Sequence, residues 1–142
     1  MLATLALLAS GLFTGAAAYI NAVEQPARLQ LADGALLAEW KVAYRRGTLM
    51  QASLAVLGGV LGAAAFLFEG RNTIALLGGA LMIASWPWTA LVVMPTNKAL
   101  MAADPERSGR RERTLVRRWA RLHGARTAFG VLACACFAFL LI

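Results

Sequence analysis

The sequence contains one histidine, two cysteines and only seven acidic residues among its 142 positions. This scarcity limits metal chemistry, because zinc, copper and non-haem iron are usually held by several imidazole, thiolate or carboxylate ligands. Cys134 and Cys136 stand two apart, which matches neither a CxxC redox pair nor a metal motif, so we expect small buried apolar side chains. No metal site is predicted and no cofactor is favoured, although iron or copper held by His123 and Glu24 stays an alternative.

Long polar stretches are also lacking, since hydrophobic residues make up 60% of the chain and the mean hydropathy is +0.64. A helix needs roughly 20 apolar residues to cross a bilayer. Four stretches meet this requirement, and they cover residues 2–23, 50–68, 73–94 and 122–142. The first stretch follows no basic segment, so we expect an uncleaved span rather than a signal peptide. The sequence therefore predicts a single all-α domain, residues 1–142, folded as an integral-membrane four-helix bundle.

The charge is concentrated in two segments. Twelve of the 14 Lys and Arg residues lie in the connecting segments 24–49 and 95–121, which follow the first and third spans and so lie on one side. The positive-inside rule makes that side the cytoplasm and both termini extracytoplasmic, and we expect a bacterial inner membrane. Basic clusters beside a membrane contact anionic lipids. The net charge of +7 is therefore not interpreted as nucleic-acid binding.

Small residues and one proline give further expectations for packing. Gly11 with Gly15, and Gly58 with Gly62, repeat the GxxxG spacing of closely packed membrane helices. We expect both pairs to close the bundle internally, with a homodimer through one of these faces as the alternative. Pro87 is predicted to kink the third span. The tryptophans beside it, Trp86 and Trp88, either pack or line a site for a flat ligand.

Polar side chains inside or beside the apolar stretches are costly in a membrane, and they usually face a bundle interior or a cavity. On the first, second and fourth predicted helices such residues recur at spacings of three or four, which puts them on one helical face. The third predicted helix ends in Thr89, followed by Thr96 and Asn97, where the end of the helix frees backbone groups that could bind a ligand. The polar residues are Asn21, Glu24 and Arg28; Tyr44, Thr48 and Gln51; Thr89, Thr96 and Asn97; and Trp119, His123, Arg126 and Thr127. All four groups meet at the basic end, where the sequence predicts a polar pocket.

A structural interpretation of these residues stays open. Glu24 would then pair with Arg28 or Arg126 in a salt bridge, and His123 would donate to a backbone carbonyl. The amides would form interhelical hydrogen bonds, and the aromatic residues would lie at the headgroup level. The amides in question are Asn21, Gln51 and Asn97, and the aromatic residues are Tyr44 and Trp119. The convergence of polar groups from four helices favours the functional interpretation.

Three separated motifs resemble a known family. They are GAAAYINAVEQPAR at residues 15–28, WPWT at 86–89 with MPTNK at 94–98, and WARLHGART at 119–127. Together they resemble the integral-membrane family DUF1772, which includes the anthrone oxygenases of polyketide pathways. The resemblance implies functional roles for the motif residues of this chain. These are Asn21, Glu24, Pro26 and Arg28; Pro95, Thr96 and Asn97; and Trp119, His123, Arg126 and Thr127.

The leading hypothesis is an anthrone oxygenase-like oxidoreductase that oxidises a membrane-soluble aromatic with O₂. His123 or Glu24 would be the base, and Arg126 would stabilise the enolate. The residues expected to bind substrate are Asn21, Arg28, Tyr44, Gln51, Trp86, Trp88, Asn97 and Trp119. The alternative is a non-enzymatic membrane module that binds a lipid or quinone, or supports a partner protein, and grips a headgroup through Arg28 and Arg126.

Overall fold

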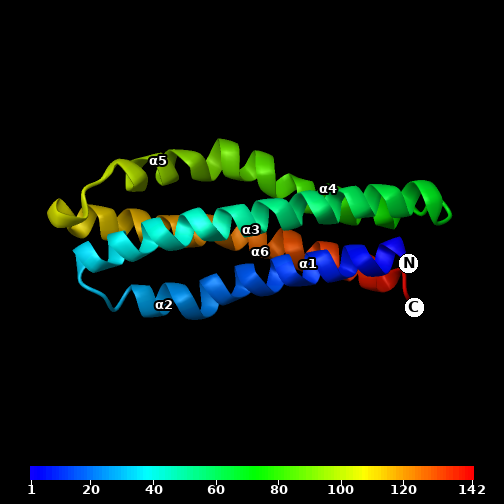
Figure 1. The fold of residues 1–142 in the computed structure, drawn as a ribbon, viewed down its shortest axis with the longest axis horizontal. Helices are drawn as coiled ribbons and strands as arrows, with labels where there is room; N and C mark the ends of the chain where they lie inside the picture. The colour runs from blue at the N-terminus through cyan, green and yellow to red at the C-terminus, as the bar shows by residue number, and fades with distance from the viewer.

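The computed structural model describes residues 1–142 as helices with short connections and no strand. Four long rods run antiparallel to one another (Figure 1). The first rod joins α1 (Leu2–Tyr19), the π-helical turn η1 (Ile20–Glu24) and α2 (Gln25–Arg28), and the second is α3 (Asp33–Phe68). The third joins α4 (Thr73–Trp88), the π-helical turn η2 (Thr89–Val93) and α5 (Met94–Ala102). A short 3₁₀ helix, η3 (Pro105–Arg107), leads to α6 (Arg110–Phe139).

Rods that follow one another in the sequence also pack side by side. α1 and α4 each pack against both α3 and α6. Both chain ends and the α3–α4 turn lie at one end, which we call the terminal end (Figure 1). The opposite end carries the α2–α3 and α5–α6 connections and is called the basic end. All four rods are long and apolar enough to span a membrane. The predicted all-α, four-helix membrane fold is confirmed, while its orientation across the bilayer stays a prediction.

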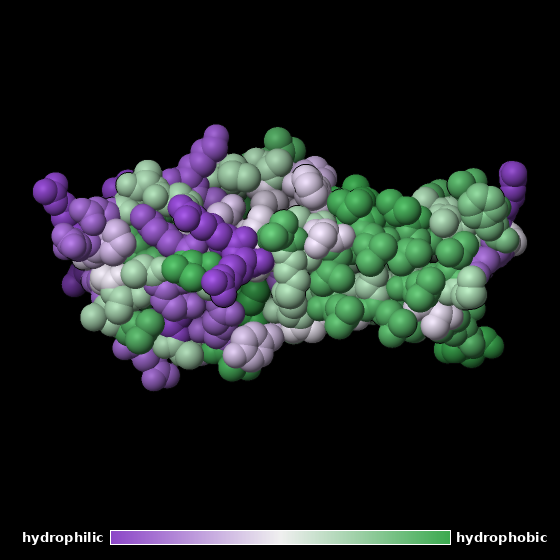
Figure 2. Space-filling view, in the orientation of Figure 1, coloured by the Kyte–Doolittle hydropathy of each residue, from purple (hydrophilic) through white to green (hydrophobic).

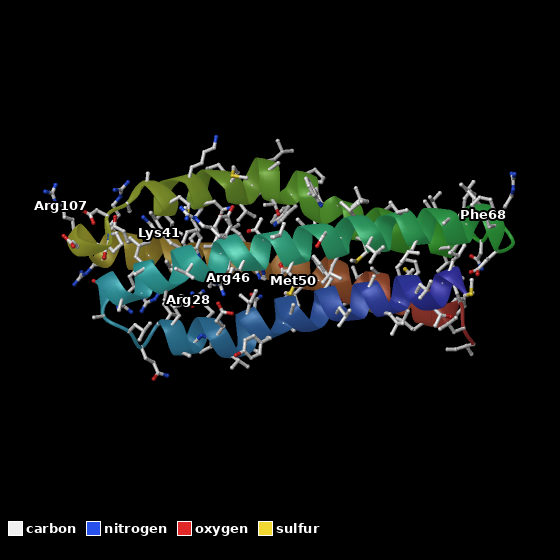
Figure 3. All side chains as sticks on the ribbon, in the orientation of Figure 1. Arg28, Lys41, Arg46, Met50, Phe68 and Arg107 are labelled. Atoms are coloured by element: carbon white, nitrogen blue, oxygen red, sulfur yellow. The ribbon has the colours of Figure 1, made fainter.

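The helices continue well beyond the apolar stretches. α3 has 36 residues, which at the helical rise gives about 54 Å, against about 30 Å for a bilayer core. Hydrophobic residues cover the half of the molecule toward the terminal end, and hydrophilic residues gather toward the basic end (Figure 2). Arg28, Lys41 and Arg107 lie in that hydrophilic half, whereas Phe68 lies at the opposite end (Figure 3). Much of the two connecting segments is therefore helical.

Two side chains fasten the ends of the bundle. At the terminal end, Glu69 accepts hydrogen bonds from the amino group of Met1 at 2.7 Å and from the first backbone N–H groups of α1. These donors, the amino group above all, lower the pKa of Glu69 from 4.5 to about 2. At the basic end, Arg113 of α6 donates to Asp33 at 2.5 Å and to the carbonyl of Leu29 at 2.7 Å. Segments far apart in sequence are thereby tied together.

The two glycine pairs behave differently. A Cβ at Gly62 would lie 2.8 Å from Cα of Gly79 on α4, so the absence of side chains lets α3 and α4 approach closely. The same is true of Gly58, where a Cβ would meet Met82. Gly11 and Gly15 are exposed on α1, and nothing lies within 4 Å of a Cβ built on either. The expectation that Gly11 and Gly15 close the bundle internally is wrong, because the face of α1 that carries them points outward.

The π-helical turns η1 and η2 share one sequence context. Each begins six residues before a proline, Pro26 in the first rod and Pro95 in the third. A proline cannot donate the usual backbone hydrogen bond, and its ring crowds the preceding turn, so a wider turn relieves the backbone. Single π turns within α-helices are frequent at functional sites. Here, the first and last residues of both turns line one cavity.

Candidate functional site

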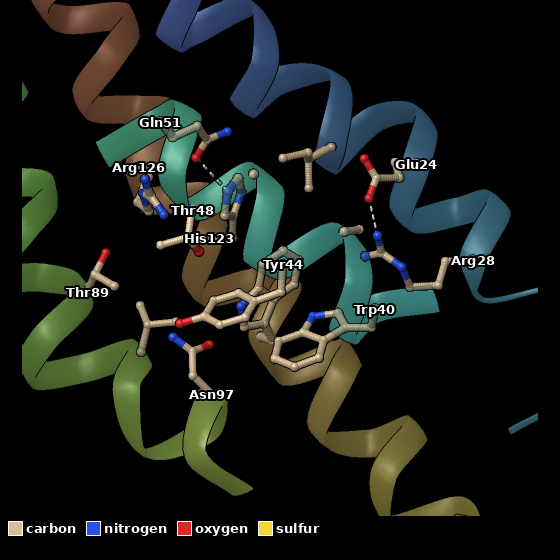
Figure 4. A pocket seen from close by; sticks show the side chains of 15 residues that line it. Glu24, Arg28, Trp40, Tyr44, Thr48, Gln51, Thr89, Asn97, His123 and Arg126 are labelled. Carbon is tan, nitrogen blue, oxygen red and sulfur yellow. Dashed lines mark hydrogen bonds and ion pairs between the residues drawn. The ribbon is translucent and has the colours of Figure 1, made fainter. Parts of the chain in front are cut away.

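A small cavity lies between the four rods, on the basic side of the apolar half, and we call it the polar cavity (Figure 4). Its volume is about 20 Å³, which is room for about one water molecule. The wall is formed by Ile20, Glu24, Arg28, Trp40, Ala43, Tyr44, Gly47, Thr48, Gln51, Thr89, Val93, Asn97, Trp119, His123 and Arg126. Every rod contributes to it, so the predicted convergence of polar residues occurs in the folded chain.

His123 is held between two amides from different helices. Its Nδ1 lies 2.8 Å from Oδ1 of Asn21 on η1, and its Nε2 lies 3.4 Å from Oε1 of Gln51 on α3. The imidazole is only 2% exposed. A neutral imidazole that carries its proton on Nδ1 donates to Asn21 and keeps a lone pair on Nε2. The short contact therefore fixes the ring. In this tautomer Nε2 is an acceptor, and because Oε1 of Gln51 is an acceptor too, their 3.4 Å separation is a contact without a hydrogen bond.

An aromatic wall backs the imidazole. Trp40 stacks on Tyr44 with ring centroids 4.8 Å apart and meets Trp119 edge-on at 5.7 Å. Trp119 in turn lies 4.9 Å from the His123 ring. Such packed rings form a rigid apolar surface, because each ring limits the rotation of the next.

Arg28 is a buried cation whose charge is fully compensated. It is 3% exposed and forms ion pairs with Glu24 and Glu39. Its Nη1 also donates to the side chain of Gln25 at 2.8 Å. This network joins the first rod to α3, and it engages the carboxylate of Glu24. The structural interpretation of Glu24, a pair with Arg28 one turn later, agrees with this geometry.

Arg126 is a second buried cation, but unlike Arg28 it has no acidic partner. It is 8% exposed, forms no ion pair, and its Nε has no hydrogen-bond partner. Its guanidinium carbon lies 5.6 Å from the centre of the Phe13 ring, which provides only a weak cation–π contact. An unpaired charge inside a membrane protein is expensive and is generally retained for function. Arg126 is thus available to an anionic ligand.

Other buried polar atoms around the cavity also lack partners within the chain. Both side-chain atoms of Asn97, Nε2 of Gln51 and the indole N–H of Trp40 belong to this set. All three residues line the polar cavity and are at most 2% exposed. Buried polar groups are nearly always hydrogen-bonded in native proteins. Their concentration at one cavity indicates a site built to bind a ligand with hydrogen-bonding oxygens.

The predicted site residues divide into three groups. Of the residues predicted to act in catalysis or substrate binding, the cavity wall includes all except Asn21, Trp86 and Trp88, and Asn21 lies directly behind His123. Thr96 and Thr127, which were also expected at the pocket, do not line it. Trp86 is half exposed and lines a neighbouring cavity. Trp88 donates from its indole nitrogen to the carbonyl of Leu122 at 3.0 Å and packs edge-on against Phe129. Its geometry is that of a packing residue rather than a cavity residue.

Sequence reasoning missed the polar or aromatic residues Trp40, Glu39 and Gln25, as well as four small or apolar residues of the cavity wall: Ile20, Ala43, Gly47 and Val93. Trp40 is fully buried, and it lies four residues before Tyr44 on the stripe that continues through Thr48, so extending that stripe by one turn finds it. Glu39 and Gln25 complete the shell of Arg28. No comparable signal in the sequence identifies those two, since both stand in a segment expected to be a loop.

The donor set offers no conventional metal centre. No three His, Cys, Asp or Glu side chains come together anywhere in the chain. His123 contacts amides, and Glu24 is engaged by Arg28. The arrangement suits proton transfer and anion binding: a fixed imidazole, an uncompensated guanidinium and free amides surround one small cavity.

Comparison with known proteins identifies the family of the chain. A family model described as anthrone oxygenase matches residues 40–136, a segment that includes Trp40, His123 and Arg126. The chain is also similar to an anthrone oxygenase of Claviceps purpurea (strain 20.1), with 31% identity over 136 residues that cover 84% of this chain and 77% of that relative. No solved structure matches the chain. The protein therefore belongs to the anthrone oxygenase family.

Proposed function

We propose that this protein is an anthrone oxygenase-like enzyme that oxidises a flat, membrane-dissolved aromatic with O₂. The observation that carries the proposal is the buried, unpaired Arg126 one turn after the buried His123 on α6. A base beside a fixed positive charge suits a reaction that converts a neutral substrate into an anion. The family match and the name of the Claviceps relative support an anthrone as the substrate class.

The proposed reaction balances with O₂ as its co-reactant. A base removes one proton from the methylene group of the anthrone, and the electron pair delocalises into the rings as an enolate. The enolate transfers one electron to O₂, and the resulting radical and superoxide combine into a carbon–oxygen bond. Protonation gives a hydroperoxide, which loses the remaining methylene hydrogen together with its terminal O–H group as water, so that the bound oxygen becomes the new carbonyl. One anthrone and one O₂ thus yield one anthraquinone and one water.

His123 is the proposed base, because Nε2 keeps its lone pair while Nδ1 is fixed on Asn21. Glu24 was the other candidate, but its ion pair with Arg28 disfavours it as a base. Arg126 and the free amide of Asn97 would donate to the enolate oxygen. Donors aimed at developing charge are most effective where water is excluded, as in this buried cavity.

The location of the reaction follows from the charge distribution. The basic end carries most of the Lys and Arg residues, so the proposal includes that it faces the cytoplasm of a bacterial inner membrane. The polar cavity then lies at the cytoplasmic side of the bilayer. Substrates that dissolve in the membrane are concentrated beside it.

The test measures O₂ uptake and anthraquinone formation with purified protein in liposomes and an added anthrone, after subtraction of the rate in protein-free liposomes. Replacing His123→Ala should lower the rate at least about 100-fold, the usual contribution of general base catalysis. His123→Gln keeps hydrogen-bonding capacity without a basic nitrogen and should lose activity equally. Circular dichroism controls for folding. Activity retained in both variants contradicts the assignment of the base.

The same assay separates the enzyme from a lipid- or quinone-binding module. The enzyme consumes O₂ in proportion to the anthrone added. A binding module retains a lipid or quinone through purification and shows no O₂ uptake above the protein-free rate. The second result contradicts the proposed oxidation.

A further inference from the structure

The polar cavity is far smaller than the aromatic substrate proposed for it. Its volume is about 20 Å³, whereas sites for small molecules typically measure roughly 300–1,000 Å³. The cavity therefore accepts one oxygen-bearing edge of a ligand, and the rings must lie elsewhere. A neighbouring space with a suitable lining is needed.

Such a space adjoins the cavity between α3 and α4, and we call it the side cavity. Its volume is about 240 Å³. It is lined by Tyr44, Thr48, Ala52, Ser85, Trp86, Thr89, Ala90, Met94 and Arg126. Tyr44, Thr48, Thr89 and Arg126 also line the polar cavity. Arg126, the cation without a partner, thus stands at the junction of the two spaces.

The side cavity continues outward into an apolar groove on the surface of the bundle. This outer groove has a volume of about 490 Å³ and shares Ala52 and Trp86 with the side cavity. Its other lining residues are Leu49, Ser53, Val56, Leu57 and Val60. Trp86 is 50% exposed at the boundary. Three adjoining spaces that share lining residues therefore lead from the outer surface of α3 to Arg126.

The sequence explains why α3 and α4 separate at this level. Nearer the terminal end, glycines such as Gly62 and Gly79 hold the two helices in close contact. Beyond Pro87 the third rod widens into η2, and it runs apart from α3 toward the basic end (Figure 1). Small side chains at Ala52 and Ala90 face the resulting space instead of filling it.

Other approaches to the polar cavity along the bundle axis are packed. On the basic side lies an apolar cluster of Leu36, Leu37, Trp40, Val93, Leu100, Val116 and Trp119. On the terminal side lies a second cluster of Ala6, Phe13, Ala55, Met82, Ala133 and Phe137. A water-phase ligand approaching along the axis would have to displace well-packed side chains, which is costly. The side opening requires no such displacement.

We propose that the substrate, a flat apolar aromatic with a hydroxyl or carbonyl oxygen at one edge, enters directly from the bilayer between α3 and α4. Its rings rest in the side cavity beside Trp86, and its oxygen edge reaches Arg126. The identity of the substrate rests on the proposed function, whereas the route rests on the three connected spaces. Trp86 thereby has a binding role at the opening, outside the polar cavity.

The test uses full-length protein in liposomes of phosphatidylethanolamine and phosphatidylglycerol, with dihydroxyanthraquinone as the probe and tryptophan fluorescence quenching as the signal. Ala52→Phe and Ala90→Phe narrow the opening from two different helices and add no tryptophan. Each should weaken probe binding by about tenfold or more, as overpacking of a filled site does. Ala128→Phe adds the same bulk to an exposed position of α6 and should bind like the wild type.

Trp86→Phe in the otherwise unchanged protein should remove most of the quenching, so the test does not depend on a bulky variant that fails to fold. Wild-type binding in both narrowed variants, or full quenching without Trp86, overturns the route. Quenching of Trp86 by brominated lipid that saturating probe does not relieve assigns the groove to a lipid chain and also overturns it.

Anthrone oxidation, measured on the same samples, distinguishes the two proposals. Probe binding that is lost in Ala52→Phe, with no O₂ uptake in any sample, supports the route and contradicts the oxidation. O₂ uptake that is equal in Ala52→Phe and the wild type supports the oxidation and contradicts the route.

Discussion

Oδ1 of Asn21 lies 2.8 Å from Nδ1 of His123, across the interface between the first and fourth rods. The two residues are 102 positions apart in the sequence. Asn21 belongs to the π turn η1, and His123 lies on α6. The contact fixes both the ring orientation and the nitrogen that carries the proton, as in other sites where an oriented histidine acts as base.

Asn21→Leu should therefore lower kcat for anthrone oxidation by about 10- to 100-fold with little change in KM, because the base is misoriented while the binding groups remain. The measurement is steady-state O₂ uptake over a range of anthrone concentrations. In the His123→Ala background the same change should have no further effect, since the two residues act as one unit. Additive losses would show that Asn21 acts independently of His123.

Arg126→Met should abolish oxidation and yet raise the free energy of unfolding by about 1 kcal/mol, because it removes a buried charge that has no partner. The lost contact with Phe13 offsets this only in part. Thermal unfolding in detergent, followed by circular dichroism, measures the stability. A large loss of stability would mean that Arg126 has a structural partner.

Arg28→Met provides the matched comparison, since it makes the same substitution at the other buried arginine. Here the change leaves the carboxylates of Glu24 and Glu39 without their cation. Because both carboxylates are partly exposed, the expected loss is about 1–3 kcal/mol rather than the full cost of a broken buried pair. The two variants should thus move the melting temperature in opposite directions.

Gly62→Ala should destabilise the bundle by about 1–3 kcal/mol, because the added methyl group collides with the backbone of α4 near Gly79 and Ala75. Gly15→Ala is the control, since nothing lies within 4 Å of the new methyl group. It should be neutral or slightly stabilising, because alanine favours the helix. Equal effects at the two positions would contradict the outward orientation of this face of α1.

The contacts of Glu69 predict that the thermal stability of the protein depends on pH in the acidic range. Its pKa is lowered to about 2 in the folded protein, chiefly by the amino group of Met1 and then by the N–H groups of Leu2 and Ala3. A lowered pKa stabilises the fold above the ordinary value of 4.5, and this contribution disappears as the pH falls toward about 2. Melting temperatures of the wild type and Glu69→Gln should therefore converge across that interval. A constant difference would contradict the role of the Glu69 charge.

The apolar stretches were sufficient to predict four helices, because the length of a membrane span leaves few alternatives in a chain of this size. Polar residues at helical spacing were sufficient to predict that His123 and Gln51 lie at the same level of the bundle, where both line the polar cavity. Both inferences depend on local periodicity, which the sequence displays directly. Their success reflects the high cost of exposing polar groups to lipid.

Features that depend on tertiary contacts could not be predicted from the sequence in the same way. Gly15 and Gly62 have equivalent sequence contexts, and only the packing of the rods decides which one faces a neighbour. Trp86 and Trp88 flank the same proline, but one opens onto the lipid-facing groove and the other packs on α6. Glu39 could not be paired with Arg28 without knowing that α3 begins as early as Asp33.

The π turns also shift the helical periodicity of the first and third rods, so that residues before and after each turn do not follow one regular α-helical pattern. Each wide turn takes one residue more than an α turn, which rotates every later side chain by about 100° relative to an uninterrupted helix. A helical wheel drawn straight through Ile20–Glu24 would therefore misplace Arg28 relative to the residues of α1 that precede the turn. Removing one residue from either turn would keep the helix and its hydrophobicity, yet it would swing one wall of the polar cavity away from His123. The site thus depends on two single-residue insertions as much as on the side chains that line it.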